Sequence, residues 1–176
     1  MKILNIAVLA VTLILMSGCA SVSSDIIVDA KTAPTVDLNG YKTYAWLGKA
    51  ALLNDPDKKW QPPKMNIAGD IKFLIDRELR KRDIFSSASK PDLAVAFFMG
   101  IDMEAMKLKM DPQTKAEMFK NVPAAALVIV LIDTKTKLVV WMGKATAELQ
   151  ENPDDEVVRE RLDYAVTEMM KKMPKN

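Results

Sequence analysis

Histidine is absent from this 176-residue sequence, and cysteine occurs only once, at Cys19. Without histidine there is no Ser–His or Cys–His nucleophile pair, no imidazole acid–base group and no histidine ligand for a metal. A single cysteine has no partner for an internal disulfide, so stability has to come from the burial of side chains. The sequence therefore predicts a protein that is not an enzyme and that holds no cofactor and no metal.

The sequence also lacks a clear excess of charge of either sign. The chain has 25 Lys and Arg residues against 23 Asp and Glu residues, and the basic residues form no block. Domains that bind nucleic acid usually carry a clear excess of basic residues gathered on one face. The charge balance therefore argues against nucleic acid as the main partner.

The N-terminus has the layout of a secretory signal. Lys2 precedes an apolar run from Ile3 to Met16, and the small residues Ser17 and Gly18 follow it. The run is shorter than the roughly 20 residues that a bilayer-spanning helix needs. This order of a positive residue, an apolar run and small residues predicts a signal peptide and not a permanent membrane helix.

The small residue directly before Cys19 makes this segment resemble the bacterial lipobox, with Met16 at the position where leucine is usual. The resemblance implies that the Cys19 thiol receives a diacylglycerol and that this cysteine becomes the new, lipidated N-terminus, with acyl chains such as palmitate. Two other interpretations remain open, namely ordinary signal cleavage after Ala20 and a structural buried cysteine.

This interpretation of the N-terminus divides the chain into three expected parts. We expect a lipoprotein signal peptide at residues 1–18, a lipid-proximal tether at 19–25 and a single domain at 26–176. Ala20 stands where an aspartate usually retains lipoproteins at the inner membrane of a Gram-negative cell. The predicted location is therefore the periplasmic face of the outer membrane, with the protein held by its lipid.

Hydrophobic periodicity predicts strands, a helix, further strands and a final helix. The fold class that this order favours is α+β, with a mostly antiparallel sheet of four to five strands and two main helices packed on one face. The expected elements are a brief strand at Ile26–Val28, a strand at Tyr41–Leu47, a helix from Asn66 to Arg82, a strand at Asp92–Glu104, a hairpin of Ala125–Ile132 and Leu138–Ala147, and a helix beginning at Asn152–Asp155.

The apolar positions of these elements predict the core. The side chains expected to be buried are Ile71, Leu74, Leu79, Val95, Phe97, Ile129, Trp141, Leu162, Val166 and Met169.

Several segments together are similar to a known family. They are the lipobox, YKTYAW at 41–46, PDL at 91–93, LIDTKTKLVVWMGKA at 131–145 and KKMP at 171–174. The chain resembles bacterial lipoproteins that carry the domain of unknown function DUF4136. This resemblance implies an envelope lipoprotein with an α+β domain, and it implies no particular activity.

The family pattern differs at one point. Where a glycine is expected after the first helix, this chain has Asp83. Aspartate is among the residues that adopt a left-handed backbone conformation, so we expect the turn to form there.

Two acidic residues give the alternative function. Asp102 and Glu104 are two apart on an expected strand and would point to the same side of it. Paired carboxylates can share the acid and base roles of glycoside cleavage, so the alternative is a hydrolase acting on envelope glycans. The same spacing also suits a solvated strand edge.

Trp60, between two lysines and two prolines, is a candidate partner contact. An aromatic side chain in such a loop can anchor an interface. Its indole can equally fold over the start of the helix that follows.

The hairpin near the C-terminus gives two more candidate contacts. Leu127–Ile132 and Leu138–Met142 are continuous apolar runs, which predicts that both faces of the hairpin are shielded. Two helices cover about one face. If Trp141 faces the helices, Val140 and Met142 face away from them, either under the 107–123 segment or on an apolar strip that binds a partner.

The function predicted from these observations is a membrane-anchored envelope lipoprotein. It would act as a non-catalytic binding or assembly module facing the periplasm. Its expected partners are the membrane, through the N-terminal lipid, and either another envelope protein or a second copy of the chain.

Overall fold

The computed structural model describes most of the chain after residue 21. The described residues are 22–34, 36–48, 51–53, 65–100, 106–110, 117–121, 125–148, 150 and 153–174. For the strands at 51–53, 106–110 and 117–121 the backbone alone is described.

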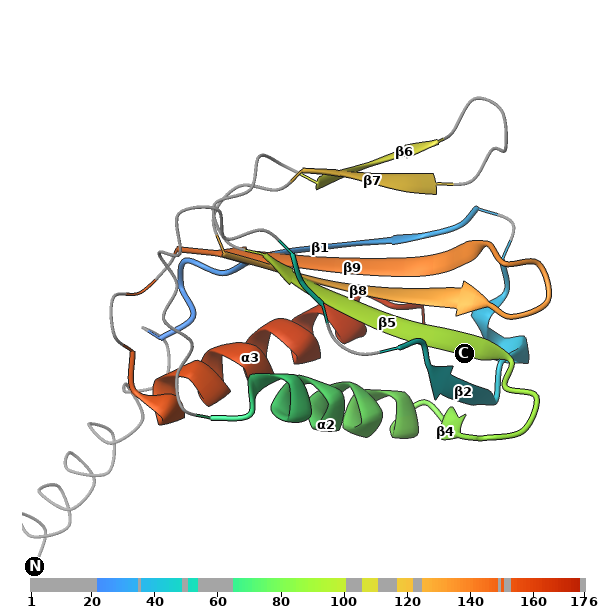
Figure 1. Ribbon diagram of the computed structural model, residues 1–176, viewed down its shortest axis with the longest axis horizontal. Coiled ribbons are helices and arrows are strands. Elements are labelled where there is room, and N and C mark those ends of the chain that lie inside the picture. Colours follow the sequence, from blue (N-terminus) through green and yellow to red (C-terminus); the bar gives the residue numbers. More distant parts are fainter. Residues whose placement is uncertain are drawn as a thin grey trace, which may run out of the picture.

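Seven strands form one mixed sheet, and both long helices lie against the same face of it (Figure 1). The strands are β1 (Ile27–Thr32), β2 (Thr43–Trp46), β3 (Ala51–Leu53), β4 (Phe85–Ser86), β5 (Leu93–Gly100), β8 (Ala125–Asp133) and β9 (Val139–Ala147). Six of them run in the order β1-β9-β8-β5-β2-β4, and β3 pairs with the last part of β5. The helices are α2 (Ile67–Arg80) and α3 (Asp155–Lys171), and a short 3-10 helix, η1 (Leu38–Gly40), precedes β2. The predicted α+β class is confirmed.

The sheet differs in detail from the expected mostly antiparallel sheet of four to five strands, because it has seven strands and is mixed. β1, β9, β8 and β5 are antiparallel neighbours, but β2 and β3 run parallel to β5, and β4 runs parallel to β2. α2 connects β3 to β4 across one face of the sheet. A helical crossover of this kind allows the strands before and after it to run in the same direction. β3 has three residues and β4 has two. Such short strands leave no alternating pattern to recognise in the sequence.

The start of α2 agrees with the sequence. The Asn66 side chain accepts a hydrogen bond of 3.1 Å from the backbone N–H of Gly69, which is a typical N-cap. The apolar positions of the helix recur at helical spacing and face the sheet.

The end of α2 forms the left-handed turn expected at Asp83, whose φ is 58°. The Ile84 N–H donates to the Leu79 carbonyl and the Asp83 N–H donates to the Arg80 carbonyl, each at 3.1 Å. This pair of bonds is a Schellman motif, and the buried side chains of Leu79 and Ile84 add the usual hydrophobic contact. Aspartate here occupies a position that glycine fills more often.

The last helix begins at the end of the predicted stretch Asn152–Asp155. α3 begins at Asp155, and Asp154 is its N-cap without a side-chain capping bond. Asp154 has an extended backbone, so Pro153 lies before the helix and not in its first turn. Asp155 and Glu156 still place negative charge in the first turn, where it favours the helix dipole.

The main core lies between the sheet and the two helices. Of the side chains predicted to be buried, Leu162 is only half-buried and the others are buried. Trp141 is completely buried against α3, together with Met169 and Met170.

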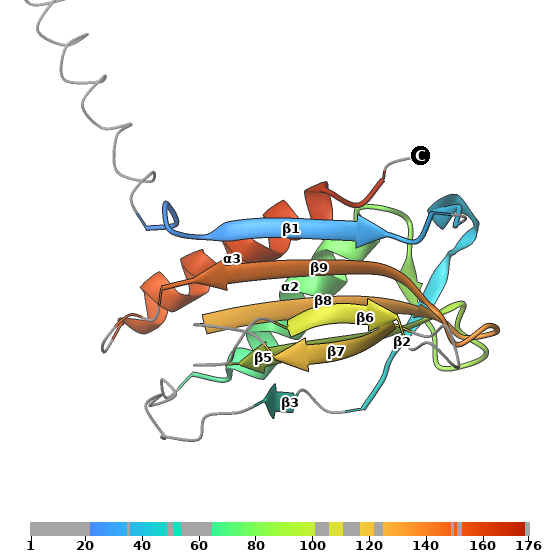
Figure 2. The ribbon, with the colours of Figure 1, turned by 90° about the horizontal axis from the view of Figure 1, so that it is seen from above.

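The second face of the sheet lies under a separate hairpin. β6 (Met106–Met110) and β7 (Glu117–Asn121) pair antiparallel and lie over β5 and β8 on the side away from the helices (Figures 1 and 2). Beneath it, Val128 is 3% exposed and Val130 is 1% exposed, although neither belongs to the helix-side core. The prediction that β8 is shielded on both faces is therefore confirmed.

A β-bulge corrects the expected direction of Val140. Leu131 pairs with Trp141 and Ile132 pairs with Val139, which leaves Val140 without a partner on β8. The extra residue lets both Val140 and Trp141 join the helix-side core, and Val140 is 1% exposed. Its expected role as a contact on the opposite face is wrong. Met142 is half-buried and stays a predicted contact.

Candidate functional site

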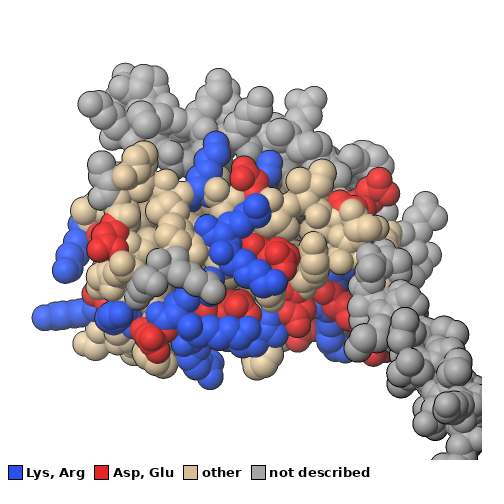
Figure 3. Space-filling model, turned by 180° about the vertical axis from the view of Figure 1, so that it is seen from behind, with Lys and Arg blue, Asp and Glu red and all other residues tan. Residues whose placement is uncertain are grey.

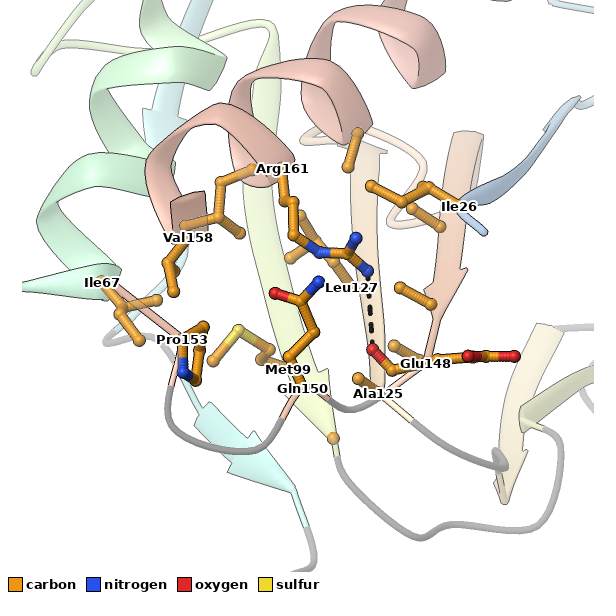
Figure 4. Close-up of a pocket in the computed structure, with 16 residues that line it drawn as sticks. Ile26, Ile67, Met99, Ala125, Leu127, Glu148, Gln150, Pro153, Val158 and Arg161 are labelled. Carbon is orange, nitrogen blue, oxygen red and sulfur yellow. Dashed lines mark hydrogen bonds between the residues drawn. The ribbon is translucent and has the colours of Figure 1, made fainter. Parts of the chain in front are cut away.

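An apolar pocket lies between the sheet and the first half of α3, at the end of the domain where the described chain begins (Figures 1 and 4). Its volume is about 140 Å³. The lining comes from the ends of several elements and consists of Ile26, Ile67, Met99, Gly100, Ala125, Ala126, Leu127, Ala145, Ala147, Glu148, Gln150, Pro153, Val158, Arg161, Leu162 and Ala165.

Small side chains explain why this space is left open. Five alanines and one glycine line the pocket, from β5, β8, β9 and α3. Farther along the same helix–sheet interface, the large side chains of Trp141, Met169 and Met170 are fully buried in the core. Well-packed cores seldom leave a void of this size, so the run of alanines keeps one end of the core hollow.

A cluster of polar contacts borders the pocket and holds the start of the described chain. Arg161 of α3 donates two bonds of 2.7 Å to the two carboxylate oxygens of Asp25 and a further bond to the carbonyl of Val22. The backbone N–H of Glu148, just after β9, donates to Asp25 at 2.9 Å. We call these four residues the tether clamp, because they tie residues 22–25 to both α3 and β9.

The positive charge of Arg161 is paired with the Asp25 carboxylate within the tether clamp. Its side chain is 12% exposed, and in Figure 4 it extends from α3 toward the carbonyl of Glu148. The Arg161 guanidinium lowers the pKa of Asp25 from 3.8 to about 2, because its hydrogen bonds favour the ionised carboxylate. The paired charges leave the pocket a mainly hydrocarbon surface, suited to an apolar group.

A second hollow of about 410 Å³ lies at the other end of the helices and is more polar. Glu78 in its wall is 3% exposed and accepts bonds from Arg77 at 3.0 Å and from Lys81 at 2.7 Å. Glu78 is thus paired with two basic side chains, whereas the buried Nε of Arg82, in the same wall, has no hydrogen-bond partner among the described residues. Over the helical layer as a whole, basic and acidic side chains are intermixed (Figure 3).

The site residues predicted from the sequence are not among the described residues that line this pocket. Cys19, Trp60, Asp102 and Glu104 lie outside the described residues. Val140 is in the core and Met142 is on the other face of the sheet, so neither lines the pocket. Sequence reasoning missed Arg161 and the alanines, although Ala145 and Ala147 at alternate positions of a strand were a visible signal.

Two further findings concern the described part of the chain. It contains no group of three or more acidic or cysteine side chains that could hold a metal ion. None of its helices has the length and apolar character needed to cross a membrane.

Fold and pocket together define an α+β domain with an apolar pocket close to Asp25 and Ile26. The family model described as "Domain of unknown function (DUF4136)" matches residues 28–175, and the chain belongs to this family. The resemblance of the sequence to the DUF4136 domain is thereby confirmed.

Solved structures with the same fold have low sequence identity. A DUF4136 family protein from Bacteroides thetaiotaomicron matches with a TM-score of 0.63 and 11% identity, over 85% of this chain and 96% of that chain. A PDZ domain protein from Parabacteroides distasonis matches with a TM-score of 0.50 and 18% identity, over 92% of this chain and 40% of that chain. A search of curated proteins found no match. These likenesses establish the fold and carry no activity with them.

Proposed function

We propose that the protein is an envelope lipoprotein, anchored in the bacterial outer membrane through Cys19, whose domain is a non-catalytic binding or assembly module facing the periplasm. The membrane is its first partner, and an envelope protein or a second copy of the chain is the second. The intermixed charge of the helical layer favours such a role over nucleic-acid binding.

The tether clamp is the observation that carries this proposal. A chain that only needed to be secreted would have no use for a fixed entry point, because the first residues of most domains are poorly held. Here Asp25 makes a two-bond ion pair with Arg161, and the Val22 carbonyl is bonded to the same guanidinium. Val22 is the third residue after Cys19. A lipid on Cys19 would therefore hold the domain close to the membrane with its pocket end nearby.

Replacement of the cysteine tests the anchor. Cys19→Ser should move the protein from the membrane fraction to the soluble periplasmic fraction, because the acyl chains supply the membrane affinity. Fractionation followed by immunoblotting measures the change, and Ser21→Ala, two residues away, serves as the matched control that should stay in the membrane. Retention of Cys19→Ser in the membrane fraction would contradict the lipid anchor.

A further inference from the structure

We propose that the apolar pocket takes the end of one acyl chain of the protein's own Cys19 lipid when the protein is outside a bilayer. This inference rests on the proposed function, because it requires a lipid on Cys19. It adds that the lipid has a binding site within the same chain.

Reach is the first argument. An extended chain spans at most about 3.6 Å per residue, so Cys19 lies within about 11 Å of Val22. The Val22 carbonyl is bonded to Arg161, and Arg161 lines the pocket. A lipid attached to Cys19 therefore starts within about 11 Å of Val22, which the clamp holds, and the pocket is within reach of an acyl chain.

Chemistry and size are the second argument. Most of the described pocket wall is formed by aliphatic side chains and alanines. Glu148, Gln150 and Arg161 are its polar members, and Arg161 is engaged by Asp25. Its volume of about 140 Å³ is close to that of an engineered core cavity of about 150 Å³ that stays dry and binds benzene. A pocket of this size accommodates a few terminal carbons of an acyl chain, while the rest of the chain lies along the surface.

Covalent attachment is the third argument. A ligand joined to its binding site by a short linker has an effective concentration in the millimolar range, so even a small pocket is occupied. Burial of the chain end removes apolar surface from water. A bilayer offers the whole chain a better environment, so insertion into a membrane empties the pocket.

Photo-crosslinking with a labelled lipid tests this inference. Cells grown with palmitate that carries a diazirine at its far end would incorporate it at Cys19. The purified protein, exchanged out of detergent into an amphipathic polymer, is irradiated, digested and mapped by mass spectrometry. We expect crosslinks within one chain to peptides that contain pocket residues of α3 and β9.

A matched pair of variants makes the test specific. Ala147→Leu adds bulk to the pocket wall at a half-buried position and should lower the yield of pocket crosslinks about tenfold. Thr146→Leu, on the other face of β9, should leave the yield unchanged. Ala125→Leu repeats the change from β8, so that the test survives if Ala147→Leu fails to fold.

The outcomes separate the two proposals. A chain that incorporates no label contradicts the proposed function itself. A labelled chain without pocket crosslinks, or with crosslinks that Ala147→Leu does not reduce, overturns the inference alone. Transfer of the crosslink to added, unlabelled Cys19→Ser protein would also overturn it, because the lipid would then bind between chains.

Discussion

Gly143 shows how a single residue position shapes the core. A Cβ atom at this position would lie 2.5 Å from the Trp141 ring and 3.1 Å from the Met169 Cβ. The indole therefore occupies the space that any other residue at 143 would need. The absence of one side chain on β9 lets the largest buried residue pack against α3.

The corresponding prediction is that Gly143→Ala is destabilising. The added methyl group meets a rigid ring in a filled core, and overpacking of this kind typically costs about 1–3 kcal/mol of unfolding free energy. Chemical denaturation monitored by tryptophan fluorescence measures the change. Gly40→Ala is the control, because a Cβ there has no neighbour within 4 Å. Equal stability of the two variants would contradict the packing described.

Asp25 gives the tether clamp a dependence on pH. Its pKa is lowered from 3.8, the ordinary value of an aspartate in an unfolded chain, to about 2 in the folded protein, chiefly by the hydrogen bonds from Arg161. Because the folded-state pKa is the lower one, the stability contributed by the ionised carboxylate is present above pH 4. It is lost as the pH falls from about 4 through 2.

We therefore predict that Asp25→Asn lowers the unfolding free energy by about 1–2 kcal/mol at pH 7. The difference from the wild type should shrink as the pH falls toward 2. Thermal unfolding of both proteins at pH 7, 4 and 2 measures this, and the other carboxylates, present in both proteins, cancel in the comparison. A difference that is as large at pH 2 as at pH 7 would exclude the ion pair as its cause.

At the scale of elements, α2 was the part of the fold that the sequence predicted best. Its N-cap, its buried face and its left-handed end at Asp83 all depend on neighbours within a few residues. Local interactions of this kind are visible in a sequence. The parallel strands β3 and β4 depend on pairing with distant segments, and they are too short to carry a pattern of their own.

The bulge and the pocket were missed for related reasons. An unpaired Val140 follows from the register between β8 and β9, which an apolar run without alternation does not define. The pocket depends on alanines from three separate elements, β8, β9 and α3, which meet at one end of the core together with Gly100 of β5. Each alanine alone is ordinary, and only the topology brings them together.

The Schellman turn at the end of α2 yields a prediction of its own. Asp83→Gly should raise the unfolding free energy by up to about 1 kcal/mol, because glycine adopts the left-handed conformation without strain. Arg80→Gly, three residues earlier at the last residue of the helix, should lower it by up to about 1 kcal/mol, because the backbone there is right-handed and glycine has a low helix propensity. Urea unfolding of the two variants measures both effects. A loss of stability in Asp83→Gly would mean that the aspartate side chain contributes more than its backbone strain costs.

At the scale of the whole molecule, the domain has two different ends. One end has the pocket and the tether clamp, which hold the chain a few residues after Cys19. Farther along the same helix–sheet interface, the large side chains of Trp141, Met169 and Met170 are fully buried in the core. The second hollow, toward the C-terminal end of α3, is more polar, so the two ends differ in the chemistry of their hollows.

The central claim is that the mature protein begins at a lipidated Cys19. Intact-mass analysis of the protein extracted from membranes tests it most directly. We predict the mass of residues 19–176 increased by a glyceryl group and acyl chains. An unmodified chain that begins at Ser21 would contradict the claim and would leave a protein that is secreted without an anchor.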